Sequence, residues 1–230
     1  MFTVAIIGPD GAGKTTIGRR LEQRLRLPVK YLYMGVSRDS SNYMFPTSRL
    51  IQVIKRMRGA KPDTGRPHDS DHAKARPKGM IKRVAVGIRL SLSLSNQIIE
   101  EWFRQALAWF YQHKGYVVLF DRHFFADYYA FDIAGNSRGR PLARRIHGFM
   151  LDRVYPRPHL VIYLDAPAEL LFARKGEGTL KSLEYQRQGY LQIRDQVKNF
   201  VIVDASQPED AVAREVTAQI WNYYKSRAGA

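Results

Sequence analysis

The start of the sequence contains a cluster of residues that could bind phosphate, namely glycines, a lysine and two threonines. The segment Gly8-Pro9-Asp10-Gly11-Ala12-Gly13-Lys14-Thr15-Thr16 follows an apolar run at 2–7 and precedes a helical pattern at 17–25. Glycines let backbone N–H groups curl around an anion, and a helix N-terminus attracts negative charge. Lys14 can reach the β- and γ-phosphates of a nucleotide, and the Thr15 hydroxyl can ligate Mg²⁺. The pattern predicts a phosphate-binding P-loop, against the alternative of a simple glycine turn.

A second group of chemical side chains is Asp121-Arg122-His123, which follows a continuous apolar run at 116–120. Such a run is typical of a buried parallel strand. A carboxylate at the end of a strand beside a P-loop can hold Mg²⁺ through its water shell. The adjacent arginine can neutralise phosphates during transfer. A strand-capping aspartate and a surface arginine are the alternative interpretation.

Two further segments could contact phosphates or an acceptor molecule. Residues 174–181 are basic and glycine-rich, which suits a flap that closes over phosphates. Residues 35–42 follow a strand predicted at 29–34, and ligands of an α/β sheet gather beyond the carboxyl ends of its strands. Arg38 in this loop is a candidate anion ligand, with a solvated surface arginine as the equal alternative.

Short apolar runs alternate with helical patterns along the whole chain. This alternation predicts an open five-stranded parallel sheet covered by helices on both faces, a three-layer α/β/α fold. The predicted helix at 81–112 contains Gly87 and a Ser91–Ser95 segment, either of which could bend or interrupt it. The predicted strands are 2–7, 29–34, 116–120, 160–164 and 200–203, and the other predicted helices are 17–25, 47–58, 124–131, 142–154, 168–173, 183–199 and a last one ending near Lys225.

The chain is predicted to form a single domain, 1–230, with a mobile basic insertion at about 59–79 and a lid-like segment at about 174–183. The insertion contains three prolines, three glycines and almost no apolar residues. Its histidines and aspartates superficially suggest metal ligands. A long loop of this composition lacks the second layer of contacts that orients ligands, so solvated polar residues are the favoured interpretation.

Composition limits the classes of function. No residue is a cysteine, which excludes disulfides and thiol chemistry, and 45% of the residues are hydrophobic, enough for a substantial core. No apolar run approaches the ~20 residues that span a bilayer, and residues 2–7 lead directly into the P-loop, so we expect no membrane insertion and a cytoplasmic location. The net charge is +16, and residues 37–83 hold twelve Lys or Arg against four Asp, a net +8. Such charge favours anionic partners but identifies none of them.

The chain resembles thymidylate kinases, within the P-loop nucleoside and nucleotide kinases. Four landmarks occur in the order typical of the family: the P-loop with Asp10 inside it, Val-Leu-Phe-Asp-Arg-His at 118–123, Tyr-Leu-Asp-Ala-Pro at 163–167 followed by Arg174-Lys175, and Val-Ile-Val-Asp-Ala-Ser at 201–206. The resemblance covers most of the chain except about 40–80. It implies a nucleotide-kinase fold, ATP and Mg²⁺ as cofactors, and a small molecule that accepts a phosphoryl group.

The resemblance also implies roles for matching residues. Asp10 would contact the acceptor sugar, Arg122 would bind the acceptor's phosphate, and Arg174 would supply positive charge in the transition state, since Ala12 leaves no basic residue inside the loop. In the family the helix around Trp102 and Trp109 pairs with a second copy, so a homodimer is an expectation here too. The expected nucleotide-binding residues are Gly8, Asp10, Gly11, Ala12, Gly13, Lys14, Thr15 and Thr16, the expected catalytic residues are Lys14, Asp121, Arg122 and Arg174, and the expected metal ligands are Thr15 and Asp121.

Two stretches depart from the family pattern. Val36-Ser37-Arg38-Asp39 stands where family members carry Arg-Glu-Pro-Gly, and Asn96-Gln97 stands where they carry Asn-Arg, whose arginine touches the base. Three functions therefore stay open: a kinase of a nucleoside monophosphate such as dTMP, a kinase of a nucleoside, sugar or other hydroxylated acceptor, and a non-catalytic nucleotide-binding module with a polyanion-binding surface. Nucleic acid is not expected as a specific partner, because no nucleic-acid-binding motif is present.

Overall fold

A parallel five-stranded sheet forms the centre of the protein in the computed structural model, which describes residues 1–35, 42–57, 80–128, 142–176 and 178–229. The strands lie in the order β2-β3-β1-β4-β5, and every neighbouring pair is parallel. The predicted sheet is therefore confirmed. The strands are β1 (Thr3–Ile7), β2 (Val29–Tyr33), β3 (Val117–Asp121), β4 (Leu160–Asp165) and β5 (Phe200–Asp204).

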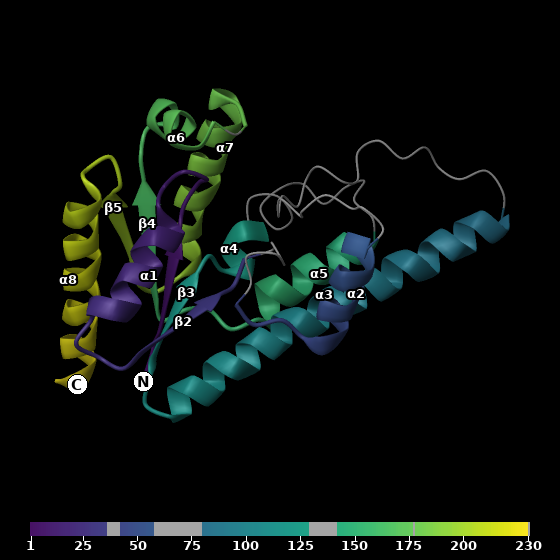
Figure 1. The fold of residues 1–230 in the computed structure, drawn as a ribbon, viewed down its shortest axis with the longest axis horizontal. Coiled ribbons are helices and arrows are strands. Elements are labelled where there is room, and N and C mark those ends of the chain that lie inside the picture. The colour runs from purple at the N-terminus through teal and green to yellow at the C-terminus, as the bar shows by residue number, and fades with distance from the viewer. Residues whose placement is uncertain (36–41, 58–79, 129–141, 177, 230) are drawn as a thin grey trace.

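The two faces of the sheet carry separate hydrophobic cores. Successive side chains of a strand point to opposite faces, so Val4 and Ile6 pack in one core while Ala5 and Ile7 pack in the other. The first core is covered by α1 (Lys14–Arg24) and α8 (Glu209–Ala228), and the second by α3 (Met80–His113), α4 (Phe124–Tyr128) and α5 (Leu142–Arg153). Figure 1 shows these two helical layers on either side of the sheet. The predicted three-layer arrangement is confirmed.

The remaining helices lie at the margins of these layers. They are α2 (Pro46–Met57), α6 (Ala168–Lys175) and α7 (Leu180–Leu191), the last followed by a 3-10 turn at Gln192–Gln196. In Figure 1, α6 lies beyond the carboxyl end of β4, α7 runs back from there alongside the sheet, and α2 lies beside α3.

Three helix predictions differ from the structure. The serine-rich segment does not interrupt α3, which continues through it as one helix. The helix predicted at 183–199 ends at Leu191, and the 3-10 turn delivers the chain to β5. Arg174 and Lys175 form the last turn of α6 rather than a loop, and Gly176 caps it in the left-handed conformation with φ of 66°. The helix therefore ends two residues later than predicted, at the point where this glycine cap can form.

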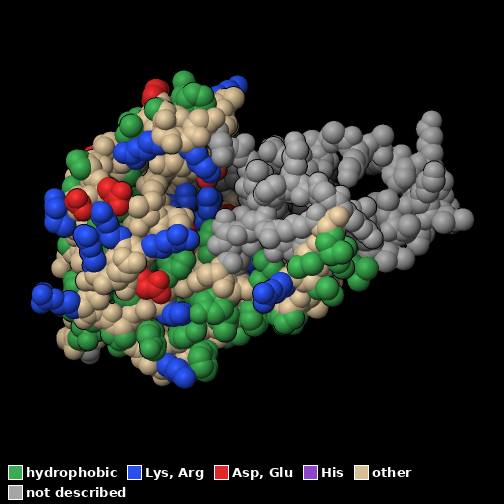
Figure 2. Space-filling model, in the orientation of Figure 1, with side chains coloured by type: hydrophobic (Ala, Val, Ile, Leu, Met, Phe, Trp, Pro, Cys, Tyr) green, Lys and Arg blue, Asp and Glu red, His purple; other side chains and the backbone are tan. Residues whose placement is uncertain are grey.

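Charged and apolar side chains are distributed differently over the surface. Figure 2 shows Lys and Arg spread over the sheet-containing body, whereas hydrophobic side chains gather over the visible side of α2. The exposed apolar residues there are Leu50, Val53, Ile54 and Met57. No helix in the described part of the chain is long and apolar enough to cross a bilayer. The predictions for Arg38 and for the insertion at 59–79 lie outside the described residues.

Candidate active site

The strand order brings the two predicted chemical segments together. β1 lies between β3 and β4, and Ile6 is paired with Asp121 of β3. The loop that follows β1 therefore begins beside the carboxylate that ends β3. Strand order reverses at β1, and this is where ligands of open α/β sheets bind.

Glycines allow the loop between β1 and α1 to pass close to other backbone. Gly8, Gly11 and Gly13 have positive φ angles of 149°, 90° and 85°, which side-chain-bearing residues rarely adopt. A Cβ at Gly11 would lie 2.7 Å from the carbonyl oxygen of Leu171 in α6. The loop is thus pressed between β1 and α6, and α1 begins directly after it at Lys14.

The side chain of Lys14 is buried inside this loop. Its Nζ donates hydrogen bonds to the carbonyl oxygens of Gly8 and Pro9, at 2.8 and 2.7 Å. An ammonium group has three N–H donors, so one remains for an anion. Burial, reinforced by the charge of Arg122, lowers the pKa of Lys14 to about 8. A bound phosphate would favour the charged form.

One carboxylate oxygen of Asp121 accepts hydrogen bonds, and the other accepts none from the described residues. Its Oδ2 accepts hydrogen bonds from the Thr15 hydroxyl at 2.6 Å and the Tyr31 hydroxyl at 2.5 Å. Its Oδ1 is buried and has no hydrogen-bond partner among the described residues. A buried carboxylate oxygen left without a donor is unfavourable. A hydroxyl that donates to a carboxylate also keeps its lone pairs for a cation, so Thr15 and Asp121 fit a Mg²⁺ site made of hard oxygen ligands.

A second carboxylate in the site, Asp10, is surrounded by cations. Its Oδ1 lies 2.7 Å from Nη2 of Arg122 and 3.6 Å from Nζ of Lys175. Burial opposes ionisation of Asp10, but Lys14, Arg122 and Lys175 outweigh it and hold the pKa of Asp10 well below its usual range. Arg122 is the one described non-glycine residue with a positive φ, 68°. Such a conformation costs about 1–3 kcal/mol and is found where a site requires it.

A third carboxylate, Asp127 of α4, faces two of the same cations, but here burial outweighs them. It is buried, and Tyr190 of α7 donates a hydrogen bond to its Oδ1 at 3.1 Å. Burial raises the pKa of Asp127 to about 6, although Arg122 and Lys14 oppose the rise. Asp127 and Asp10 thus flank one arginine, and Asp10 alone is paired closely enough to stay ionised at every ordinary pH.

The predicted site residues do not all meet at one place. The loop, Lys14, Thr15, Asp10, Asp121 and Arg122 converge between β1 and β3. Arg174 points elsewhere, because its Nη1 donates to the carbonyl oxygen of Ala205 beyond β5 at 2.8 Å. Within the loop Ala12 is buried and Thr16 is exposed.

Three side chains of this site were not predicted to be functional. Tyr31 is an alternate residue of an apolar strand, Lys175 follows the arginine that was chosen, and Asp127 lies in a predicted helix. Composition could have identified Asp127, since it is the one charged residue in the otherwise apolar segment of α4. Tyr31 gives no such signal, because strand tyrosines are ordinarily core residues.

Gln97 on α3 occupies the position where the resemblance expects an arginine. Its Nε2 donates to Oε1 of Glu101 at 3.2 Å and lies 2.5 Å from the Tyr128 hydroxyl. Because a carboxylate only accepts hydrogen bonds, the nitrogen of the Gln97 amide must face Glu101. Glu101 is held in turn by His147 of α5, at 2.8 Å. The N–H groups of Gln97 are therefore committed to the protein.

Known proteins support the assignment suggested by this geometry, although no protein-family model matches the chain. A probable thymidylate kinase of Archaeoglobus fulgidus is 28% identical over 229 residues, which cover 96% of this chain and 95% of the relative. A thymidylate kinase of Deinococcus radiodurans is 28% identical over 226 residues, which cover 95% and 93%. Over nearly its whole length the chain is similar to thymidylate kinases.

The likeness covers at least 95% of the chain, so it concerns the whole fold rather than the P-loop alone. The all-parallel sheet, with helices on both faces and a P-loop after β1, is that of a P-loop nucleotide kinase. Together the fold and the relatives indicate a phosphotransferase of this thymidylate kinase-like type. A non-catalytic binding module is the interpretation they disfavour.

Proposed function

We propose that the protein transfers the γ-phosphate of ATP to a nucleoside monophosphate, with dTMP as the first candidate, and that it requires Mg²⁺. The observation that carries this proposal is the pairing of Thr15 with Asp121, whose Oδ1 is buried and lacks a donor in the described chain. Both relatives are thymidylate kinases by name. The proposal thus combines two supports: a donor site with oxygen ligands suited to a cation, and the acceptor class named for those relatives.

On the donor side, the loop and Lys14 would bind the β- and γ-phosphates. Thr15 and Asp121 would hold Mg²⁺, directly or through its water shell, and the ion would neutralise charge on the phosphate oxygens. Lys14 is already positioned at the loop by two carbonyl oxygens, so little reorganisation is needed when the phosphates bind. Phosphoryl transfer depends mainly on such positioning and charge neutralisation.

On the acceptor side, Arg122 would bind the phosphate of the monophosphate and Asp10 would orient a sugar hydroxyl. Asp10 keeps its charge because Lys14, Arg122 and Lys175 outweigh its burial and lower its pKa. A carboxylate with so low a pKa is a poor general base but a good hydrogen-bond acceptor. We infer that Asp10 positions the acceptor and does not remove its proton.

Gln97 favours a second candidate, a kinase whose acceptor is a different nucleotide, a nucleoside or a sugar. Its amide N–H groups are committed to Glu101 and Tyr128, so it would offer a carbonyl oxygen to a bound molecule. A group that accepts hydrogen bonds selects a partner with N–H or O–H donors. The acceptor need not be dTMP for the donor site to work as proposed.

A panel of acceptors tests the proposal. ADP release from ATP would be measured with dTMP, the other nucleoside monophosphates, thymidine and simple sugars, with Mg²⁺ and with excess EDTA. We expect turnover with at least one monophosphate, which EDTA abolishes. Turnover of thymidine or sugars alone would support the second candidate, and no turnover with any acceptor would refute both.

A further inference from the structure

The side chain of Arg122 passes over Gly35, which has no side chain of its own. A Cβ built on Gly35, just after β2, would overlap Cδ of Arg122 and would lie 2.5 Å from the Tyr33 hydroxyl oxygen. Real Cβ atoms do not approach other heavy atoms so closely. Gly35 has no positive φ, so glycine is required here for space and not for backbone conformation.

The backbone at Arg122 is fixed from both sides. Its N–H donates to the Ile6 carbonyl oxygen of β1 at 3.0 Å, and the Asp121 carbonyl oxygen accepts from the N–H of Met34 at 2.9 Å. Arg122 therefore cannot move its main chain to escape a crowded neighbour. The position of its side chain depends on the space over Gly35, because the side chain crosses Gly35 before its guanidinium pairs with Asp10.

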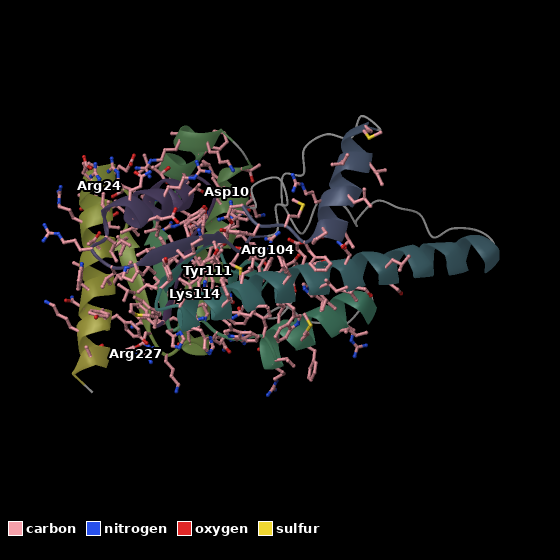
Figure 3. All side chains as sticks on the ribbon, turned by 60° about the horizontal axis from the view of Figure 1, so that its bottom comes forward. Asp10, Arg24, Arg104, Tyr111, Lys114 and Arg227 are labelled. Atoms are coloured by element: carbon pink, nitrogen blue, oxygen red, sulfur yellow. The ribbon has the colours of Figure 1, made fainter. Side chains whose placement is uncertain are left out.

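Gly35 is itself held by a buried ion pair on α3. Nη1 of Arg104 donates to the carbonyl oxygen of Gly35 at 2.9 Å, while its Nε and Nη2 donate to Oε1 of Glu100 at 3.0 and 2.9 Å. Arg104 is 2% exposed, which makes it one of the most deeply buried large side chains of the described residues. Figure 3 labels Arg104 beside α3 and Asp10 in the loop after β1.

The same ion pair also holds the chain on the far side of residues 36–41. Oε2 of Glu100 accepts a hydrogen bond from the N–H of Phe45 at 3.0 Å, at the entrance to α2. One arginine and one glutamate thus fix the segment on both sides of residues 36–41. Truncating one member alone would leave the other charge buried without its partner, which is costly.

We infer that Gly35 and the Arg104–Glu100 pair are positioning residues that hold the Arg122 guanidinium where the acceptor's phosphate binds. This inference rests on the proposed function of Arg122. It assigns acceptor affinity to residues that touch no substrate. A displacement of about 1 Å in such a group can cost a large factor in turnover, so small changes at Gly35 should have large effects.

A double-mutant cycle between Gly35→Ala and Arg122→Ala tests the inference, with ATP and dTMP as substrates. We expect Gly35→Ala to raise the KM for dTMP about tenfold or more and to leave the KM for ATP within about twofold. In the Arg122→Ala background the same substitution should have no further effect on the KM for dTMP, because the group it displaces is gone. Equal effects in both backgrounds would overturn the inference.

Gly115→Ala provides a matched control. Gly115 has a φ of 83° and open space around it, so an alanine there strains the backbone far from Arg122. It should lower the melting temperature without changing the KM for dTMP. A rise in the KM for dTMP equal to that of Gly35→Ala would show that general destabilisation is sufficient, against the inference.

A neutral pair of substitutions covers the case in which Gly35→Ala does not fold. Glu100→Gln with Arg104→Gln removes the guanidinium donors to Gly35 without leaving a buried charge. It should raise the KM for dTMP and spare the KM for ATP. An unchanged KM for dTMP would overturn the inference.

The position of Arg122 can also be measured without turnover. The ¹⁵N resonance of its Nε–H group, identified by its loss in Arg122→Ala, should shift and exchange faster with water in Gly35→Ala or in the neutral pair. An unchanged resonance would contradict the inference even if no acceptor is phosphorylated. Failure of the wild-type protein to turn over any monophosphate would instead refute the proposed function.

Discussion

The donor and acceptor sides of the candidate site are built from different materials. The donor side is compact: it consists of the glycine loop, of Lys14 bonded to the carbonyl oxygens of that loop, and of Thr15, which is bonded to Asp121 at the end of β3. The acceptor side depends on long side chains from separate elements, namely Arg122 and, behind it, Arg104 of α3. The first is fixed by strand register, whereas the second is fixed by ion pairs and by space.

Their charges differ as well. The donor carboxylate, Asp121, is bonded by two neutral hydroxyl groups and has an oxygen to spare. The acceptor carboxylate, Asp10, already faces the cations Arg122 and Lys175. The spare oxygen of Asp121 on the donor side therefore fits Mg²⁺, while on the acceptor side an incoming phosphate must share Arg122 with Asp10. Breaking each side separately should consequently give different kinetic defects.

The largest expected effect is that of Lys14→Ala on turnover. Removing the buried ammonium should lower kcat by about three orders of magnitude, because a preorganised charge at the transferred phosphate is lost. The fold should survive, since burial already disfavours the charge of Lys14. Coupled ADP release and a melting curve would check both statements. Lys114→Ala, which changes a surface lysine that lies over Phe110, is the matched control and should leave turnover unchanged. Unchanged turnover in Lys14→Ala would contradict the donor assignment.

Next in size is the effect of Arg122→Ala on the acceptor. Loss of a charge-assisted hydrogen bond is worth about 1.5–3 kcal/mol, so the KM for dTMP should rise about 10- to 100-fold. The KM for ATP should change much less. Initial rates at varied dTMP and at varied ATP separate the two constants, and Arg24→Ala on the exposed side of α1 serves as the control. Equal losses for both substrates would show that the two sides are not independent.

The difference between the two sides also explains what the sequence could predict. The strands, the P-loop and Asp121 follow from short local patterns, because glycines, a lysine and an apolar run determine this geometry almost by themselves. Arg174 illustrates the limit of local patterns. A basic residue near two glycines suggests a phosphate-binding flap, but Arg174 lies in the last turn of α6 and donates to the carbonyl oxygen of Ala205. The roles of Gly35 and Arg104 were not predicted, because each depends on contacts between elements that are distant in sequence.

A smaller effect, on stability, is expected from Asp127→Asn. Burial raises the pKa of Asp127 from 3.8 to about 6, so the native state binds more protons than the unfolded state between those values. The free energy of unfolding should therefore fall as the pH rises from about 4 to 7, by about 2–3 kcal/mol. In Asp127→Asn this part of the pH dependence should disappear, and the variant should be more stable than the wild type at pH 8.

Urea unfolding of both proteins at pH 5 and pH 8 measures this difference. Asp195→Asn, which alters an exposed aspartate on the 3-10 turn after α7, is the control and should follow the wild type. If Asp127→Asn kept the wild-type pH dependence, Asp127 would not be the buried acid responsible. The result distinguishes the pH dependence of stability due to Asp127 from that due to Asp10. The pKa of Asp10 is low, so its charge stabilises the fold down to acidic pH.

The smallest expected effect is a pH dependence of nucleotide binding that belongs to the donor side alone. Burial and the charge of Arg122 lower the pKa of Lys14 to about 8, so above that pH the empty protein increasingly carries a neutral amine in the loop. Binding of phosphates then requires the uptake of a proton, and the Kd for ATP should rise about five- to tenfold between pH 7.5 and pH 9. Calorimetric titrations in buffers of different ionisation enthalpy would detect this proton uptake. Lys14→Ala should bind ATP weakly and without the pH dependence, and a wild-type Kd that stays constant up to pH 9 would show that Lys14 remains charged in the empty site.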